Sequence, residues 1–382
     1  MVAIDSYAGG DGRLSPLSTP SATRAVLEAH GIGTKYTLGQ NFLVNDDVLK
    51  KIVALAEVGE NDRILEVGPG IGTLTIALLK HAASVIAIER DPDLPAVLAD
   101  TLHPWREKFA LIEKDALDVT RDDIVSVVST MVEPGGDAGF LDRASSAANE
   151  TAQWAVSQSE DCLSESRYRV AVPQEELRPS LPSKLVANLP YAVAATVVLD
   201  YFESFLFLDS ATIMVQKEVA DRMAAAVGTK NYGAYTVKLG LYVEPAGRFA
   251  VGPGNFFPPP RVDSAVIRLN RRVPLMADGA PASPEVIAAA ALMADAAFTN
   301  RRKTIANSCK TYFSGRGPIS LGAGPSAQEG APGIVLPDGA AIAERLAAIF
   351  DAATIDPRRR GETLTQQEFL ALGAALLKVT AA

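Results

Sequence analysis

The stretch KLVANLPYAVAAT, residues 184–196, places an amide, a proline and an aromatic ring between a strand-like apolar run and a helical pattern. The Asn188 side-chain oxygen and the backbone carbonyl of Leu189 or Pro190 can together accept both hydrogens of an exocyclic amine. Tyr191 offers a face on which a nucleobase can stack. The proline ring restricts the backbone and keeps the acceptors in place.

Acceptors of this kind suit the methylation of an aromatic amine. The N6 lone pair of adenine is delocalised into its ring, and accepting the two N–H groups aims that lone pair at an electrophile. The sulfonium methyl of S-adenosylmethionine (AdoMet) is already reactive, so positioning supplies most of the catalysis. The alternative interpretation is an ordinary strand-to-helix turn, in which Asn188 is a cap and Tyr191 packs.

A second group of residues suits a nucleoside cofactor. Gly68, Gly70 and Gly72 follow a strand-like run and open a helical one, which allows a ligand to approach the backbone closely. Glu89 ends the next strand and could accept bonds from both ribose hydroxyls. Asp115, after the third strand, could bond the adenine amino group of AdoMet, or could be a simple turn aspartate. The spacing Glu-x-Gly-x-Gly-x-Gly favours AdoMet over a nicotinamide cofactor, and a glycine loop without a ligand is the simpler alternative.

The elements that carry these residues alternate along the chain. Strands are expected at 63–68, 84–89 and 109–115, with helices at 73–82 and 93–102. This order predicts right-handed βαβ units and a parallel sheet. The carboxyl ends of such strands converge on a ligand crevice, so the glycine turn and Asn188 should face the same site.

The rest of the chain suggests further divisions. Strands are expected at 210–216, 233–244 and 261–270, and helices from Pro284 onward. We therefore expect an α/β protein with a disordered lead at 1–36, a Rossmann-like AdoMet-dependent methyltransferase domain at 37–275 and a small α-helical domain at 284–378. Segments rich in Gly, Ser, Ala and Pro interrupt the two domains at 133–182 and 315–338 and read as surface loops.

Composition excludes several classes of protein. The 382 residues are 48% hydrophobic and 21% charged, which is globular, and contain no run long enough to span a membrane. No secretory signal is found at the N-terminus. Only two cysteines and three histidines occur, without metal-ligand spacing. We therefore expect a cytoplasmic protein without a metal.

The motifs together resemble the ribosomal RNA adenine N6,N6-dimethyltransferases, most closely the bacterial enzymes of the 16S type. The resemblance runs through most of 37–375. Its stretches are LGQNFLVNDDVLKKIV (38–53), ILEVGPGIGTLT (64–75), IERDPDL (88–94), KDALDV (114–119), VANLPY (186–191), MVQKEVADRM (214–223), FFPPPRVDSAVIRL (256–269), AFTNRRKTIANS (297–308) and IDPRRRGETLTQQEF (355–369).

The resemblance implies roles for individual residues. The cofactor-binding positions would be Asn41, Leu43, Gly68, Gly70, Glu89, Asp115 and Asn188. Phe256 would stack on the target adenine opposite Tyr191, although Phe257 stands where relatives more often carry a small or polar residue. After NLPY many relatives carry an Asn and a Ser-Thr pair, of which only Thr196 is kept here, so the loop after Tyr191 is less polar than in those relatives.

The implied reaction places two methyl groups on each of two adjacent adenines in a hairpin loop near the 3′ end of 16S rRNA, within an immature small subunit. A loop is a sensible target because its bases can be splayed into a pocket. We expect the enzyme to act as a monomer and the helical domain to engage RNA. Basic residues that could contact phosphates are Lys217, Arg222, Arg261, Arg301, Arg302 and Lys303, with a further cluster at 358–360.

The net charge of −9 argues against nucleic-acid binding only when taken as a sum. Nine acidic residues and four arginines give the segment 133–182 a charge of −5, more than half of the total. We expect residues 135–166 of this insertion to form a surface loop that points away from RNA and is dispensable for methylation. Each basic cluster could equally be an ordinary solvated surface.

Three rival functions remain open. A 23S rRNA adenine methyltransferase of the macrolide-resistance type shares the core motifs, but FFPPPRVDSAV and FTNRRKTI favour the 16S type. A DNA adenine methyltransferase would more often carry Asn/Asp-Pro-Pro-Tyr. A non-catalytic ribosome-assembly factor is the third, and the intact Gly68, Glu89, Asp115 and Asn188 argue against it.

Overall fold

The computed structural model describes residues 12–33, 40–132, 180–316, 319–320, 333–334 and 340–381. Most of the two expected insertions, at 133–182 and 315–338, lies outside these residues, and so do the predictions made for them. The chain forms two compact units. The first comprises Met1–Val193, Phe207–Met214 and Ala250–Val266, and the second comprises Ala194–Leu206, Val215–Phe249 and Ile267–Ala382.

A parallel sheet is confirmed for the strands that the sequence predicted. These are β2 (Arg63–Val67), β3 (Ser84–Glu89), β4 (Phe109–Glu113), β5 (Lys184–Asn188) and β6 (Ser210–Gln216). Strand β2 pairs in parallel with β3 and β5, β3 with β4, and β5 with β6. The full order is β4-β3-β2-β5-β6-β9-β7. From β2, the next strands in the chain, β3 and β4, are added toward one edge of the sheet. From β5, the later strands are added toward the other edge. This reversal puts the ligand crevice at the carboxyl ends of β2 and β5.

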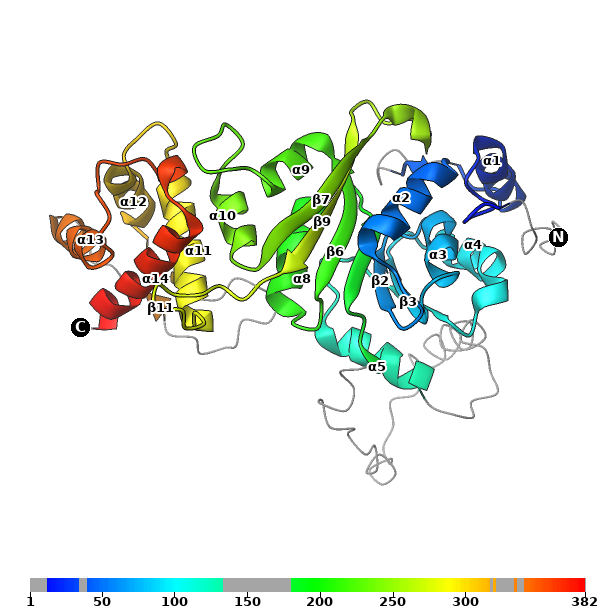
Figure 1. Ribbon diagram of the computed structural model, residues 1–382, viewed down its shortest axis with the longest axis horizontal. Helices are drawn as coiled ribbons and strands as arrows, with labels where there is room; N and C mark the ends of the chain where they lie inside the picture. The colour runs from blue at the N-terminus through cyan, green and yellow to red at the C-terminus, as the bar shows by residue number, and fades with distance from the viewer. Residues whose placement is uncertain are drawn as a thin grey trace, which may run out of the picture. The chain divides into compact units, whose positions relative to one another are not determined.

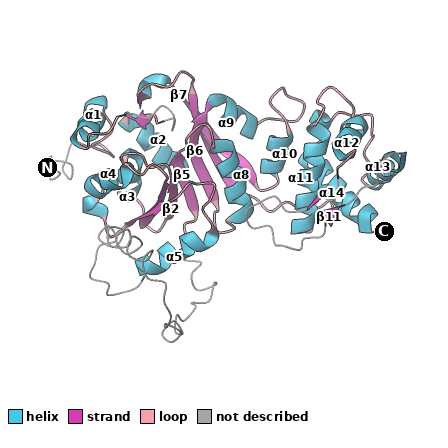
Figure 2. Cartoon of the chain, turned by 180° about the vertical axis from the view of Figure 1, so that it is seen from behind, coloured by secondary structure: helices cyan, strands magenta, loops and turns pink. Residues whose placement is uncertain are grey.

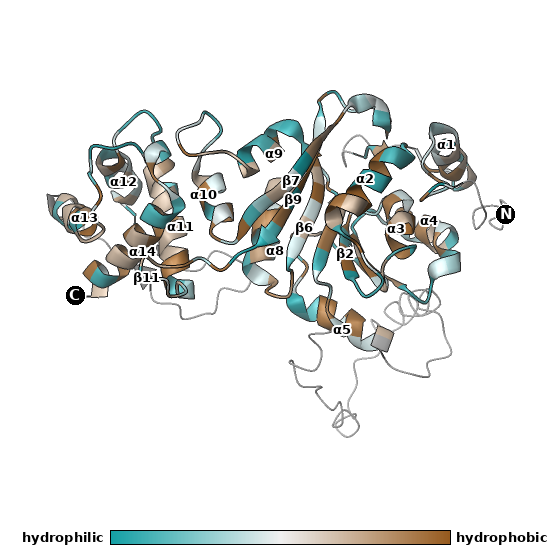
Figure 3. Ribbon diagram, in the orientation of Figure 1, coloured by the Kyte–Doolittle hydropathy of each residue, from teal (hydrophilic) through white to brown (hydrophobic). Residues whose placement is uncertain are grey.

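Helices α2 (Asp46–Ala56), α3 (Thr73–Leu79), α4 (Leu94–Thr101) and α5 (Arg121–Val132) accompany these strands, with a 3-10 turn at His103–Trp105 (Figures 1 and 2). Asn45 starts α2 by accepting bonds from the Asp47 and Val48 N–H groups. Figure 3 shows both hydrophilic and hydrophobic residues on α2. Leu49 and Ile52 are buried while Lys50 and Lys51 are exposed, so burial of one apolar face favours this helix.

A separate two-stranded sheet joins distant parts of the first unit. Strand β1 (Phe42–Leu43) pairs antiparallel with β8 (Phe256–Phe257), and Phe42 lies opposite Phe257 while Leu43 lies opposite Phe256. The 3-10 turn Pro253–Asn255 precedes β8. The Asn255 carbonyl accepts from the Val44 N–H at 2.8 Å, and its side chain accepts from Asn45 Nδ2 at 2.8 Å.

The expectation of a disordered lead over 1–36 is wrong for its later part. Helix α1 spans Pro20–Ala29, with Thr19 as its N-cap. Leu17, Val26 and Leu27 are buried. The segment is ordered by contacts with residues far along the chain, which local sequence patterns do not display.

The strand expected at 233–244 is also wrong over most of its length. Its first part is helix α10 (Ala234–Gly240), and β7 (Val243–Val251) begins only afterwards. The Thr236 hydroxyl accepts from the Gly233 N–H and donates to the Arg222 carbonyl, which fixes the helix start. The expected strand at 261–270 is confirmed as β9 (Ser264–Arg271).

The second unit contains α8 (Ala194–Ser204), α9 (Lys217–Met223), α10, α11 (Pro284–Phe298), α12 (Ile305–Phe313), α13 (Ala340–Ala352) and α14 (Gln366–Ala381), with a 3-10 turn at Gly361–Thr363. Short strands β10 (Ile319–Ser320) and β11 (Gly333–Ile334) pair antiparallel. A Cβ on Gly373 would lie 2.6 Å from the Val286 carbonyl oxygen, so α11 and α14 pack at a distance that needs glycine.

Residues 194–206, 215–249 and 267–283 thus belong with the C-terminal helices in the second unit. The Tyr232 hydroxyl donates to the Leu364 carbonyl at 2.7 Å, and Lys238 pairs with Asp295 at 3.1 Å. The chain therefore does not divide at a single point near 275–284, where we expected a domain boundary.

Candidate active site

The glycine turn after β2 has a backbone that other residues rarely adopt. Gly68, Gly70 and Gly72 have φ values of 70°, 59° and 88°. A Cβ on Gly68 would lie 3.5 Å from Pro190 Cδ and 3.8 Å from the Asn188 carbonyl oxygen. The turn therefore lies directly against the NLPY turn, as the strand order requires.

The glycine turn also contacts the segment that carries Asn41 and Leu43, two of the cofactor-binding positions that the resemblance implies. A Cβ on Gly70 would come within 3.1 Å of the Phe42 ring. Leu43, the next residue, pairs with Phe256 of β8. One strand of two residues thus joins the glycine turn to the aromatic loop expected to hold the target base.

Glu89 is placed as the sequence predicted, at the end of β3. Its Oε1 accepts from the backbone N–H groups of Arg90 and Asp91, both at 2.9 Å. Burial raises the pKa of this carboxyl, and the backbone N–H groups oppose the shift. The side chain is held in one orientation before any ligand arrives, which suits a ribose contact.

Asp115 has partners of its own within the protein. Its Oδ1 accepts from the Leu117 N–H at 3.1 Å, which is the turn role expected as the alternative. Its Oδ2 forms an ion pair with Arg90 at 2.7 Å. An adenine amino group bound here would share the carboxylate with Arg90, a residue that the motifs did not single out.

Glu66 is a further acidic residue that sequence reasoning did not assign to the site. It lies on β2, two residues before Gly68, and is 1% exposed. Burial raises its pKa to about 8, the Thr75 hydroxyl opposes the shift, and the Glu89 carboxylate adds to it. Among the described residues Glu66 Oε2 has no hydrogen-bond partner. Its position as the first residue of the Glu-x-Gly-x-Gly-x-Gly motif was the signal that could have found it.

Asn188 lies at the end of β5 with its amide already oriented. Its Nδ2 donates to the Asn41 carbonyl at 3.1 Å, which leaves Oδ1 as the end that can accept from a substrate amine. The Pro190 carbonyl accepts from the Val193 N–H at 3.2 Å. Of the two backbone acceptors considered from the sequence, the Leu189 carbonyl is therefore the better candidate.

The two aromatic residues expected to hold the base differ in their surroundings. Tyr191 is half-buried, and its hydroxyl lies 2.5 Å from the Ser264 hydroxyl. Phe256 is 4% exposed. Phe257 is half-buried and lies under Arg24 of α1, whose guanidinium carbon is 5.2 Å from the ring centre. Phe257 already has a stacking partner, so Phe256 is the better candidate for contact with the base.

The basic residues expected to contact RNA fall into two groups. Lys217 pairs with Asp221 at 3.0 Å, and Arg301 pairs with Glu362 at 2.8 Å and donates to the Thr229 carbonyl at 3.0 Å. The others are exposed and form no ion pair within the described part of the chain: Arg222, Arg261, Arg302 and Lys303.

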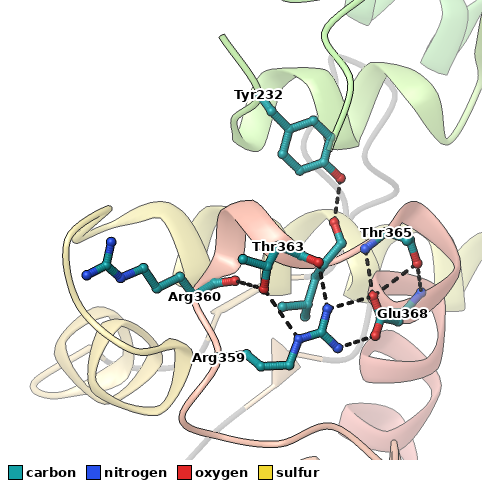
Figure 4. A network of polar contacts seen from close by, with 7 residues as sticks. Tyr232, Arg359, Arg360, Thr363, Thr365 and Glu368 are labelled. Carbon is teal, nitrogen blue, oxygen red and sulfur yellow. Dashed lines mark hydrogen bonds and ion pairs between the residues drawn. The ribbon is translucent and has the colours of Figure 1, made fainter. Parts of the chain in front are cut away.

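The cluster at 358–360 divides in the same way. Figure 4 shows the Arg359 guanidinium inside a network, where it contacts Glu368 and the Thr363 carbonyl. Arg358 pairs with Asp356 at 3.1 Å. The Arg360 guanidinium points away from the network. Arg359 thus serves the fold of the second unit.

No group of three potential metal ligands occurs among the residues that the structure describes. No helix in that same part of the chain is long and apolar enough to cross a membrane.

The first unit offers what an adenosine-containing cofactor requires. A tight glycine turn allows close backbone approach, Glu89 is a fixed acceptor, and a buried Glu66 oxygen lacks a partner among the described residues. The residues present therefore fit AdoMet.

Residues 33–317 match the ribosomal RNA adenine dimethylase family. The chain belongs to this family. A relative from Geobacillus sp. (strain WCH70), named ribosomal RNA small subunit methyltransferase A, is 33% identical over 363 residues, spanning 95% of this chain and 98% of the relative. A relative of the same name from Enterococcus faecalis is 33% identical over 366 residues, spanning 95% and 97%. The family resemblance drawn from the motifs is confirmed.

Solved structures confirm the Rossmann-like methyltransferase fold of the family. A dimethyladenosine transferase from Plasmodium falciparum superposes with a TM-score of 0.56 at 19% identity, covering 88% of this chain and 98% of that one. The 23S rRNA methyltransferase ErmE superposes with a TM-score of 0.50 at 19% identity, covering 88% and 99%. At this identity the likeness concerns the fold alone and does not separate the two substrates.

Proposed function

We propose that this protein transfers methyl groups from AdoMet to N6 of adenines in small-subunit ribosomal RNA, giving N6,N6-dimethyladenosine. One observation carries the proposal. The NLPY turn, with Asn188 held by Asn41, lies against the Gly68 turn at the point where the strand order reverses. A cofactor methyl group and an adenine amine can meet there, in a chain of the ribosomal RNA adenine dimethylase family.

The finer proposal is that the targets are two adjacent adenines in the hairpin loop near the 3′ end of 16S rRNA, within an immature small subunit. The relatives named small subunit methyltransferase A support this choice over 23S rRNA. We further propose that the protein acts as a monomer in the cytoplasm, where ribosomal subunits are assembled.

The cofactor side of the site is built from the first unit. Gly68 and Gly70 allow the backbone to approach the ligand, and Glu89 would accept the ribose hydroxyls. Asp115, held by Arg90, would accept the adenine amino group, and Asn41 and Leu43 would cover the cofactor. Bound AdoMet supplies an electrophilic methyl group on a sulfonium centre.

The substrate side has two acceptors for one amine. Asn188 Oδ1 and the Leu189 carbonyl would take the two hydrogens of adenine N6 and so direct its lone pair. Fixed acceptors lower the barrier because they need no reorganisation during the reaction. Pro190 limits the backbone, and Tyr191 and Phe256 would stack on the two faces of the base.

Methyl transfer from labelled AdoMet tests the proposal. The substrates are unmethylated small subunits, naked 16S rRNA, 23S rRNA and double-stranded DNA, with mass spectrometry of the nucleosides. We expect dimethyladenosine in small-subunit RNA and none in DNA. Transfer to 23S rRNA alone would favour the macrolide-resistance type, and normal AdoMet binding without transfer would favour a non-catalytic assembly factor.

A further inference from the structure

We propose that Ser264 is a positioning residue for the target adenine, acting through the hydroxyl of Tyr191. The inference rests on the function proposed above. The Ser264 and Tyr191 hydroxyl oxygens are 2.5 Å apart, and the two residues are 73 positions apart in the chain. No sequence motif predicted a contact between Ser264 and Tyr191.

The surroundings of Ser264 require its hydroxyl to find a hydrogen-bond partner inside the protein. It is the first residue of β9 and is 0% exposed. The next residues, Ala265, Val266 and Ile267, are all buried and apolar. A hydroxyl in such a run is shielded from water and needs a partner inside the protein. The Tyr191 hydroxyl is that partner.

The hydrogen bond sets the orientation of the Tyr191 ring and does not serve to ionise the phenol. Burial raises the pKa of the Tyr191 phenol, so the group stays neutral, and either hydroxyl can be the donor. A tyrosine at the end of a turn can otherwise rotate about its side-chain bonds. Tethering the far end of the ring sets the plane on which a base stacks.

The same bond links the two segments that would enclose the base. Tyr191 follows β5, whereas Ser264 ends the loop that starts with Phe256 in β8. Holding one segment to the other fixes the spacing of the two aromatic residues. The Glu89 carboxylate is held by its own backbone neighbours and not by this hydroxyl pair, so a change here should act on the substrate and leave AdoMet affinity unchanged.

A double-mutant cycle tests the proposal on the full chain with unmethylated small subunits. Ser264→Ala and Tyr191→Phe should each lower kcat about 10-fold, the usual effect of losing one buried hydrogen bond. The double variant should lose no more than either single variant, since both remove the same bond. Ser264→Thr keeps the hydroxyl and should restore most of the activity.

Ser210→Ala provides the matched control, because Ser210 is a buried serine that starts the neighbouring strand β6. It should leave kcat unchanged. AdoMet affinity by calorimetry and the unfolding midpoint show that each variant is folded. Multiplicative losses in the double variant, or normal kcat in folded Ser264→Ala, would overturn the positioning role and leave the proposed function intact. Absence of methyl transfer in the parent protein would overturn both.

Discussion

Glu89 is poised for a ligand by bonds from its own backbone neighbours, Arg90 and Asp91. Glu89→Ala should weaken AdoMet binding by about 1–3 kcal/mol, because charge-assisted hydrogen bonds to the ribose are removed. Calorimetry measures the affinity directly. Glu113→Ala is a suitable control, since this exposed carboxylate ends the neighbouring strand β4. Equal affinities of Glu89→Ala and the parent, with both folded, would remove Glu89 from the cofactor site.

A substitution at Asn188 should distinguish positioning of the substrate amine from binding of AdoMet. Asn188→Ala removes the side-chain acceptor of the amine, so turnover should fall by several orders of magnitude while AdoMet affinity falls much less. Single-turnover methylation and calorimetry give the two quantities. Near-normal turnover would show that the amide is only a structural cap.

Glu66 should make stability depend on pH. Its folded pKa of about 8 lies above the unfolded value, so the folded state holds a proton that the unfolded state releases. Stability from this group is complete below the unfolded pKa and is lost as pH rises toward 8. Relative to Glu66→Gln, the parent should lose on the order of 2–4 kcal/mol of unfolding free energy between pH 5 and pH 8. Urea unfolding at several pH values measures the difference, and parallel profiles would contradict it.

For individual residues, the sequence predicted those that belong to motifs with a defined spacing. Gly68, Glu89 and Asn188 lie where strand ends place them, because the order of βαβ units fixes those positions. Ser264 and Arg90 were not assigned, since their partners, Tyr191 and Asp115, become neighbours only through folding. Arg301 was grouped with the RNA contacts. Its partner Glu362 lies 61 positions later in the chain, so the pairing could not be read from the local sequence.

Among the elements, α1 depends on one acidic side chain of the next helix. Asp46 Oδ1 accepts from the Leu14 N–H at 2.8 Å, the Ser15 N–H at 3.2 Å and the Ser18 hydroxyl at 3.3 Å. Burial opposes ionisation of Asp46, but bonds from Lys50, Ser15 and Leu14 hold its pKa below the usual value. A short helix without such an anchor is marginal in water, which explains why local sequence suggested disorder.

Asp46→Ala should therefore release the N-terminal segment. We expect a loss of about 1–3 kcal/mol and faster amide exchange in α1, because backbone N–H groups at Leu14 and Ser15 lose their acceptor. Asp47→Ala is the matched control, as Asp47 contacts Lys50 but not the segment. Hydrogen exchange of α1 that is as slow in Asp46→Ala as in Asp47→Ala would show that the buried Leu17, Val26 and Leu27 suffice to hold it.

Helix α10 shows that an alternating sequence pattern does not always predict the type of secondary structure. The run GAYTVKLGLYVE alternates in a way that favours a strand, yet Ala234–Gly240 is helical. The Thr236 hydroxyl accepts from the Gly233 N–H at the start of the helix, and Val237 and Leu239 are buried. Tertiary packing thus overrides a weak local preference.

For the whole molecule, the parallel sheet was predictable because its strands repeat at regular spacing with helices between them. The division into units was not, because residues 194–206 and 215–249 join helices that follow much later in the chain. Net charge was similarly misleading as a single number. The charge of −9 says little about RNA binding when exposed cations such as Arg302 and Lys303 are unpaired within the described residues.

RNA affinity should depend on the unpaired cations and not on Arg301. Arg302→Ala with Lys303→Ala should weaken RNA binding and reduce the slope of log affinity against log salt by about 0.7 for each phosphate that is no longer neutralised.

Arg301→Ala should instead lower stability, since Glu362 and the Thr229 carbonyl lose their partner. Its salt slope should stay near that of the parent, and AdoMet affinity should be unchanged in both variants. Filter binding at several salt concentrations and thermal unfolding separate the two effects. A full salt slope in the Arg302→Ala, Lys303→Ala variant would show that these side chains form a solvated surface, and the RNA contacts would then have to come from other cations such as Arg222 and Arg261.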